Sequence, residues 1–113
     1  MFEKNMKYAY LTDIYGGLLE KHAREWMDAY YNEDLSLAEI AEGTGISRQG
    51  IRQNIKKCEE MLDLYEEKLG LLKKSTEAAA MADELSRIGD AAPLSEADRK
   101  AICALAARLK SLM

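Results

Sequence analysis

The segment Ser36–Lys57 has the sequence SLAEIAEGTGISRQGIRQNIKK, which predicts two short helices joined by a tight turn. Leu37 and Ile40 follow the i, i+3 spacing that places apolar side chains on one face of a helix. Gly45 can adopt the positive φ that a sharp turn requires. Ser47 is a good N-cap, because its hydroxyl can accept a hydrogen bond from a free backbone N–H of the next helix. This order of helix, glycine turn and capped helix predicts a helix-turn-helix.

The second of these helices has one apolar side and one polar side. Ile51 and Ile55 are spaced to bury the apolar side. Arginine and glutamine can pair with guanine and adenine edges, and lysine binds phosphates. We therefore predict a recognition helix, with the arginines and glutamines nearest the bases and the lysines at phosphates. The candidate DNA-binding residues are Ser47, Arg48, Gln49, Arg52, Gln53, Lys56 and Lys57.

Charge is distributed unevenly along the chain, whose formal net charge is −4. Residues 1–42 contain four basic and nine acidic residues, and residues 59–113 contain eight basic and eleven acidic ones. Residues 43–58 contain four basic residues and no acidic one. A concentrated basic face on an acidic protein favours a site-selective binder of nucleic acid over a general coat protein. The alternative is that these four charges only solvate an exposed helix face.

Two runs of residues resemble a known family. Tyr30–Ala41 (YYNEDLSLAEIA) and Ser47–Lys56 (SRQGIRQNIK) are similar to the marks of the YlxM-like family of small helix-turn-helix proteins, and Ser36–Lys57 also resembles region 4 of bacterial sigma factors. The resemblance covers Met1 to about Lys73. It implies a bacterial cytosolic protein whose gene lies beside that of the signal recognition particle GTPase, and hence a link to that pathway. Gly50 departs from the family pattern, in which alanine is usual.

Composition favours an all-α protein. The 113 residues include one proline, and 48% of them are hydrophobic, so the chain can form a modest core. It has no apolar run long enough to cross a bilayer and no pattern of a signal peptide at its start, and we expect a cytoplasmic protein without membrane contact.

Two helices are expected before the helix-turn-helix, over about residues 5–19 and 21–31. Their apolar stripes are Leu11, Ile14, Tyr15 and Leu18 in the first helix, and Ala23, Trp26, Met27 and Tyr30 in the second. Trp26 and Tyr30 could stack on bases, but their spacing predicts that they form the packing centre of the first three helices.

The helix that begins at Ser47 meets no helix breaker before Gly70. Its apolar residues repeat with alternating intervals of four and three, which predicts a narrow seam facing one partner helix. That partner is either a second copy of the chain or the helices of the C-terminal part. The seam consists of Ile51, Ile55, Cys58, Leu62, Tyr65, Leu69 and Leu72.

The C-terminal part predicts two more helices separated by a linker over residues 89–93. The first spans Ser75–Ile88, and the second is capped by Ser95. The last helix has an apolar seam of Ile102, Leu105, Leu109 and Leu112. We expect a helix-turn-helix domain over residues 1–73 and a helical extension over residues 74–113, with homodimerisation through the second half of the chain.

Residue patterns typical of catalysis are missing from the sequence. There is no phosphate-binding glycine loop, and the single histidine, His22, has no triad partner. Cys58 and Cys103 are far apart, and we expect two reduced, buried thiols with no metal and no cofactor. The carboxylate pairs Glu59–Glu60 and Glu66–Glu67 are expected on a solvated outer face. We therefore expect no enzymatic activity.

The sequence favours an all-α protein with a sigma region 4-like helix-turn-helix head, a long fourth helix and a C-terminal helical extension. Its expected function is sequence-selective DNA binding in transcriptional regulation, as a homodimer. The alternative is an accessory protein of the signal recognition particle that binds its RNA or its GTPase. A third interpretation is a helical interaction protein that no longer binds nucleic acid.

Overall fold

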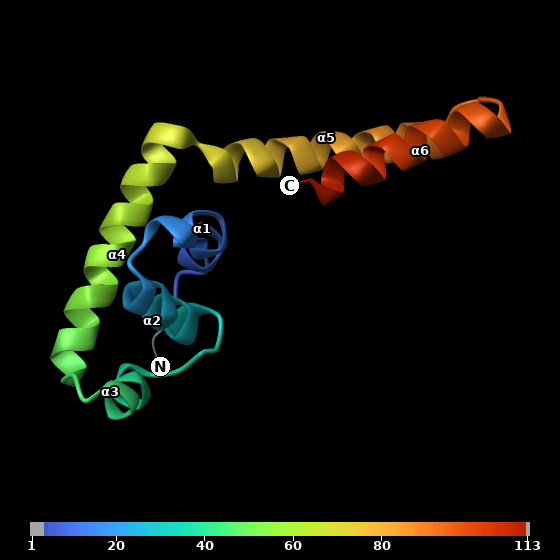
Figure 1. The fold of residues 1–113 in the computed structure, drawn as a ribbon. Coiled ribbons are helices and arrows are strands. Elements are labelled where there is room, and N and C mark those ends of the chain that lie inside the picture. Colours follow the sequence, from blue (N-terminus) through green and yellow to red (C-terminus); the bar gives the residue numbers. More distant parts are fainter. Residues whose placement is uncertain (1–3, 113) are drawn as a thin grey trace. The chain divides into compact units, whose positions relative to one another are not determined.

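A computed structural model describes residues 4–112 and confirms the all-α class with a helix-turn-helix. The chain divides into two compact units, Met1–Leu72 and Lys73–Met113, which are described separately below. The described elements are α1 (Lys7–Tyr15), the short 3-10 helix η1 (Gly16–Leu18), α2 (Lys21–Tyr31), α3 (Leu37–Thr44), α4 (Arg48–Leu69), α5 (Leu71–Ala91) and α6 (Glu96–Ser111). In the first unit, α1, α2 and α3 lie along one side of the long α4 (Figure 1).

The first helix is shorter than its apolar spacing predicts, and it buries a different face. Leu11 and Tyr15 are buried as expected, but Ile14 and Leu18 are 36% and 58% exposed, so that part of the predicted stripe is wrong. Thr12 is buried instead, and its hydroxyl donates a 2.6 Å hydrogen bond to a backbone carbonyl one turn earlier. Because this bond satisfies the hydroxyl, a polar residue can lie where the periodicity places an apolar one.

The second helix has the expected bounds, but its packing centre is not the tryptophan. Met27 is fully buried in the core that α1, α2 and α4 share. Trp26 is only partly buried, and its ring stacks on that of His22 with 6.2 Å between the ring centroids. The prediction that Trp26 forms the packing centre is therefore wrong, because it points to the edge of the core and Met27 occupies the middle.

The apolar seam of α4 packs against its own unit. Four of its residues are buried in one cluster with side chains of α1 and α2, namely Ile51, Ile55, Cys58 and Leu62. The prediction that a second copy or the C-terminal helices would cover this seam is therefore wrong at these four positions. Only near the end of α4 does the seam leave the core, where Leu69 is 47% exposed.

Three tyrosines of α1 and α2 donate hydrogen bonds to carboxylates of α4. The pairs are Tyr8–Asp63 at 2.8 Å, Tyr15–Glu66 at 2.7 Å, and Tyr31–Glu59. Glu59 and Glu66 therefore lie at the packed side of α4, and the prediction of a solvated face is wrong for them. It is correct for Glu60 and Glu67, which are exposed. The hydroxyl donors come from helices distant in sequence, so the local charge pattern does not reveal them.

In the second unit, α5 and α6 form an antiparallel helical hairpin (Figure 1). The contact between them is made by small residues, and Ala82, Gly89 and Ala106 are buried. An ion pair of 2.8 Å between Asp83 and Lys110 joins the two helices along one edge. Ser95 caps α6 as predicted, since its hydroxyl accepts the Asp98 backbone N–H.

Helix α5 is longer than expected and extends into the predicted linker. Gly89 is inside the helix and allows close contact with α6, because an added Cβ would lie 3.0 Å from Cγ2 of Ile102. Of the seam predicted for α6, only Ile102 lies at the contact with α5. Leu105, Leu109 and Leu112 are 62%, 39% and 82% exposed and stay uncovered within the hairpin, since α6 turns its small side toward α5.

Candidate nucleic-acid interface

The turn between α3 and α4 is built by local chemistry. Ser36 and Glu39 form a reciprocal capping box at the start of α3. Gly45 ends α3 with φ 75°, the left-handed conformation that glycine adopts without steric cost. Ser47 caps α4, and its hydroxyl accepts the backbone N–H of Gly50 at 3.0 Å. These caps fix where α4 begins and therefore which of its side chains face outward.

The seven candidate DNA-binding residues all lie on α4 or at its cap and are all exposed. Within residues 4–112, no ion pair is made by the four cations among them, which are Arg48, Arg52, Lys56 and Lys57. Their charge is therefore available to a phosphate backbone. The structure brings these residues together on one helix, but it holds no nucleic acid that would assign a role to each.

Gly50 is a packing requirement of the turn. A Cβ at this position would lie 2.8 Å from Cγ2 of Ile46 and 3.2 Å from the hydroxyl of Ser47. The first contact is closer than real Cβ atoms approach, and the second is tight enough that the Ser47 hydroxyl would have to shift by a few tenths of an ångström. The departure from alanine at Gly50 thus has a structural reason, because the side chain of Ile46 packs against the first turn of α4.

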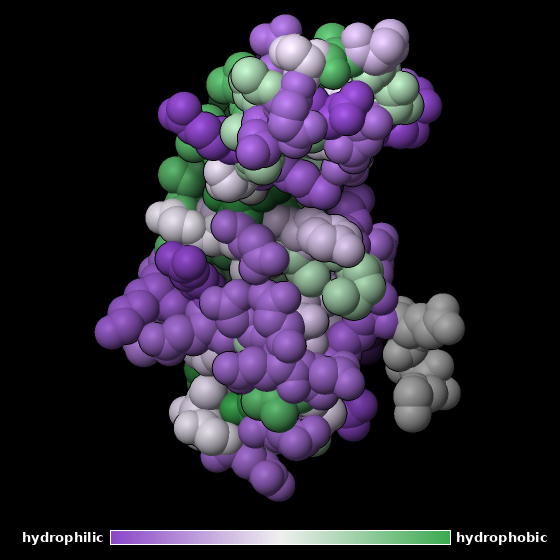
Figure 2. All heavy atoms as spheres, turned by 90° about the vertical axis from the view of Figure 1, so that its right-hand side faces the viewer, coloured by the Kyte–Doolittle hydropathy of each residue, from purple (hydrophilic) through white to green (hydrophobic). Residues whose placement is uncertain are grey.

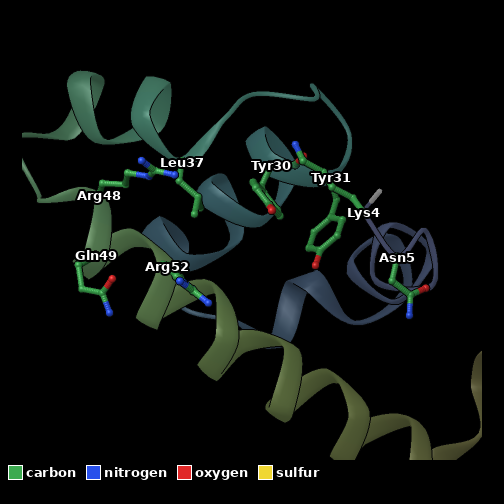
Figure 3. A pocket seen from close by; sticks show the side chains of 8 residues that line it. All are labelled: Lys4, Asn5, Tyr30, Tyr31, Leu37, Arg48, Gln49 and Arg52. Carbon is green, nitrogen blue, oxygen red and sulfur yellow. The ribbon is translucent and has the colours of Figure 1, made fainter. Parts of the chain in front are cut away.

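A pocket of about 560 Å³ lies beside the cationic side of α4. Figure 3 shows the side chain of Arg48 directed toward Leu37, whereas Gln49 points away from it, and Arg52 lines the pocket one turn further along α4. A second, smaller pocket of about 280 Å³ continues along α4 and is lined by Arg52 and Lys56. The cations on this side of α4 therefore border a recess that α2 and α3 complete.

The wall of this pocket depends on Lys4, a residue that sequence reasoning missed. Its ammonium donates hydrogen bonds of 2.6 Å and 2.8 Å to the backbone carbonyls of Tyr30 and Leu35. It also pairs with Asp34 at 3.3 Å and lies 3.9 Å from the centre of the Tyr30 ring. No local pattern signals this role, because the lysine acts on backbone groups about 30 residues away.

No cluster of three or more His, Cys, Asp or Glu that could hold a metal occurs in the described part of the chain. Both cysteines are free, and Cys58 is buried as expected, whereas Cys103 is only half-buried. Burial raises the pKa of the Cys58 thiol, which disfavours the reactive thiolate. None of the helices between residues 4 and 112 has the length and apolarity to span a membrane.

Comparison with known proteins places the chain among helix-turn-helix proteins. Residues 2–102 match the family UPF0122, described as "Putative helix-turn-helix protein, YlxM / p13 like". A UPF0122 protein of Bacillus cereus strain AH187 is 46% identical over 88 residues, which are 78% of this chain and 80% of the relative. UPF0122 proteins of Bacillus anthracis strain A0248 and Bacillus thuringiensis subsp. konkukian strain 97-27 match with the same identity and coverage.

Proposed function

The chain belongs to the UPF0122 family of YlxM/p13-like helix-turn-helix proteins, and from this premise we propose that it is a sequence-selective DNA-binding regulator of transcription in the cytoplasm. The observation on which the proposal depends is the exposed, unpaired cationic side of α4 directly after a capped turn. The proposal gives the protein a binding role and no catalytic one.

In the proposed complex, the first half of α4 lies in the major groove. Arg48, Gln49, Arg52 and Gln53 reach base edges, Lys56 and Lys57 hold phosphates, and Ser47 starts the helix at the backbone. The local absence of carboxylates supports this arrangement, because residues 43–58 contain no acidic side chain while the rest of the chain is acidic. DNA would therefore be attracted to α4 and repelled elsewhere.

The proposed regulator is a homodimer, formed through the α5–α6 hairpin. Between these helices only small residues are buried, so the hairpin alone has little core. Figure 2 shows apolar side chains among polar ones in the upper part of the view, and larger apolar residues remain exposed on both helices. A second copy would cover them in a four-helix bundle, and two heads could then bind half-sites about 34–36 Å apart.

Selection of bound sequences from a random DNA library by the full-length protein tests this function. We expect one enriched motif. Gln53→Ala should relax the base preference at one position of that motif. Lys57→Ala should weaken binding to all sequences and lower the slope of log affinity against log salt concentration by about one. Failure to enrich any motif, with the same affinity for every duplex in low salt, would contradict sequence-selective binding.

A second candidate function is binding of structured RNA, including that of the signal recognition particle, or of its GTPase. The position of Arg48 and Arg52 beside a pocket favours it, because RNA helices are recognised by shape and phosphates more than by base edges. Sequencing the nucleic acid that copurifies with the protein from cells distinguishes the two functions. Short DNA sites support the regulator, and enrichment of the particle RNA supports the alternative.

A further inference from the structure

We propose that the pocket formed by residues 4–5, α2, α3 and α4 binds a free nucleoside monophosphate, and that the bound nucleotide excludes DNA from α4. Binding of the nucleotide does not depend on any other function of the protein. Exclusion of DNA rests on the proposed function. The protein would thus release DNA in response to a small phosphorylated ligand.

The pocket has the size and the charge for such a ligand. Its volume of about 560 Å³ falls within the range of about 300–1,000 Å³ that is usual for small-molecule sites. Three cationic side chains and no carboxylate line it. Two acidic groups are bound to its wall: Asp34, which pairs with Lys4 and is 91% exposed, and the half-buried Glu59, which accepts the hydroxyl hydrogen bond of Tyr31. Neither carboxylate lines the pocket, so an anion in it meets positive charge at the lining itself.

The phosphate is assigned to Arg48 and Arg52. These side chains lie one helical turn apart at the pocket, and neither makes an ion pair with a described residue. The planar guanidinium group can bind two phosphate oxygens at once, which makes arginine well suited to a phosphate monoester. Lys4 does not bind the phosphate, because its ammonium is already bonded to two carbonyls and to Asp34.

The flat base is assigned to the apolar part of the pocket. Tyr30, Tyr31 and Leu37 line it, and the two tyrosine rings meet edge to face at 4.9 Å. Such a wall accepts a planar ring by stacking or edge contact. Asn5 also lines the pocket and offers an amide group that can hydrogen-bond to base edges. A phosphate-binding end beside an aromatic and amide-lined end matches the two parts of a nucleotide.

Competition with DNA follows from shared residues. Arg48, Gln49 and Arg52 line the pocket and also belong to the proposed DNA-binding set. A phosphate bound between the two arginines neutralises half of the four positive charges in residues 43–58. Because affinity for DNA depends steeply on the number of phosphates that a protein neutralises, occupancy of the pocket should weaken DNA binding at constant ionic strength.

Calorimetric titration of the full-length protein with adenosine 5′-monophosphate tests the proposal. Adenosine, ribose 5-phosphate and inorganic phosphate serve as partial ligands, and NMR spectra monitor Tyr30 and Leu37. We expect saturable binding that is tighter than for any partial ligand. Arg52→Ala should weaken it about 10- to 100-fold. Lys68→Ala, a matched loss of one exposed charge on α4 outside both the pocket and the DNA-binding set, should leave it unchanged.

The proposal is overturned if adenosine 5′-monophosphate does not saturate at millimolar concentration, if inorganic phosphate binds equally well, or if both variants weaken binding alike. Binding of single-stranded oligonucleotides without binding of the mononucleotide would also overturn it. DNA binding is measured separately, without nucleotide. If the protein binds the nucleotide but no DNA, the nucleotide site is supported and the proposed function is contradicted. If the protein binds DNA and the nucleotide does not weaken that binding, the proposed exclusion of DNA is wrong.

Discussion

The hydroxyl of Tyr15 donates a 2.7 Å hydrogen bond to Glu66, and the two side chains together cap the start of α5. The same hydroxyl accepts the backbone N–H of Leu71 at 3.0 Å, and the Glu66 carboxylate accepts that of Leu72 at 3.0 Å. The first N–H groups of a helix have no partner within the helix, so these contacts satisfy them. Tyr15 is 2% exposed, so the end of α1 is fixed to the junction of α4 and α5.

Tyr15→Phe should lower the free energy of unfolding by about 1–3 kcal/mol, because Leu71 N–H and Glu66 each lose a partly buried hydrogen bond. Urea denaturation at neutral pH measures the loss. Tyr10→Phe is the control, since the Tyr10 side chain is exposed, with 57% of the residue accessible, and should change stability little. Equal effects of the two substitutions would contradict a capping role for the Tyr15 hydroxyl.

Stability should fall as the pH rises above about 10, where tyrosine ionises in the unfolded chain. Burial, and then the hydrogen bond to Glu59, raise the pKa of Tyr31 in the folded protein. The folded state therefore retains a proton that the unfolded state loses, and the slope of stability against pH is negative.

Urea denaturation at several pH values between 8 and 11 checks this dependence. Tyr31→Phe should flatten the alkaline fall. Tyr8, Tyr15, Cys58 and Lys7 also have raised pKa values and remain in the variant, so the difference between parent and variant reports the loss of the Tyr31 hydroxyl. Parallel curves for the two proteins would show that Tyr31 does not contribute.

The helix-turn-helix could be predicted from the sequence because its determinants are local. The two serine caps and Gly45 each act on backbone groups within three or four residues, so their spacing alone places the turn. The position of Trp26 could not be predicted in this way. Periodicity gives the phase of a helix, but not which of two adjacent apolar residues occupies the centre of the core.

The candidate site could be predicted only as far as α4 itself. With Ile51 and Ile55 on the buried side, Lys57 faces away from the core. Arg48 and Arg52, in contrast, flank that side at i, i+3 spacing and so border the pocket. The pocket beside them requires Lys4 to reach the carbonyls of Tyr30 and Leu35, a contact between segments distant in sequence. The bonds from tyrosines to α4 were missed for the same reason, since charge patterns along one helix contain no information on donors from another.

Gly50→Ala should destabilise the protein, although alanine is the better helix former by about 0.5–1 kcal/mol. The added Cβ would be 2.8 Å from the branched side chain of Ile46, and overpacking of this kind costs about 1–3 kcal/mol. Thermal unfolding should show a lower Tm. The control is Gly43→Ala in α3, which has no neighbour within 4 Å and should raise Tm.

A second substitution identifies the cause of this destabilisation. Ile46→Ala in the Gly50→Ala background removes the close contact, so the change at Gly50 should become neutral or favourable there. If Gly50→Ala raises Tm in the parent chain, the packing argument is wrong, and the higher helix propensity of alanine determines the effect of the substitution on stability.

The last prediction concerns self-association through the exposed apolar face of the α5–α6 hairpin. Met81, Leu85 and Ile88 follow the i, i+4, i+7 spacing on α5 and are 63%, 46% and 48% exposed. Leu105 and Leu109 form the corresponding row on α6. For antiparallel helices in contact through Ala82 and Ala106, helical geometry places both rows on one face, opposite the Asp83–Lys110 ion pair. A second copy related by a two-fold axis would bury this face against itself, because such an interface is self-complementary.

Sedimentation equilibrium should therefore show a dimer for the full chain and a monomer for Leu105→Glu. Leu64→Glu on α4 is the matched control, since Leu64 is 50% exposed in the other unit and should leave the dimer intact. A parent chain that remains monomeric at high micromolar concentration would end the dimer hypothesis, because the hairpin would then need no partner to cover its apolar face.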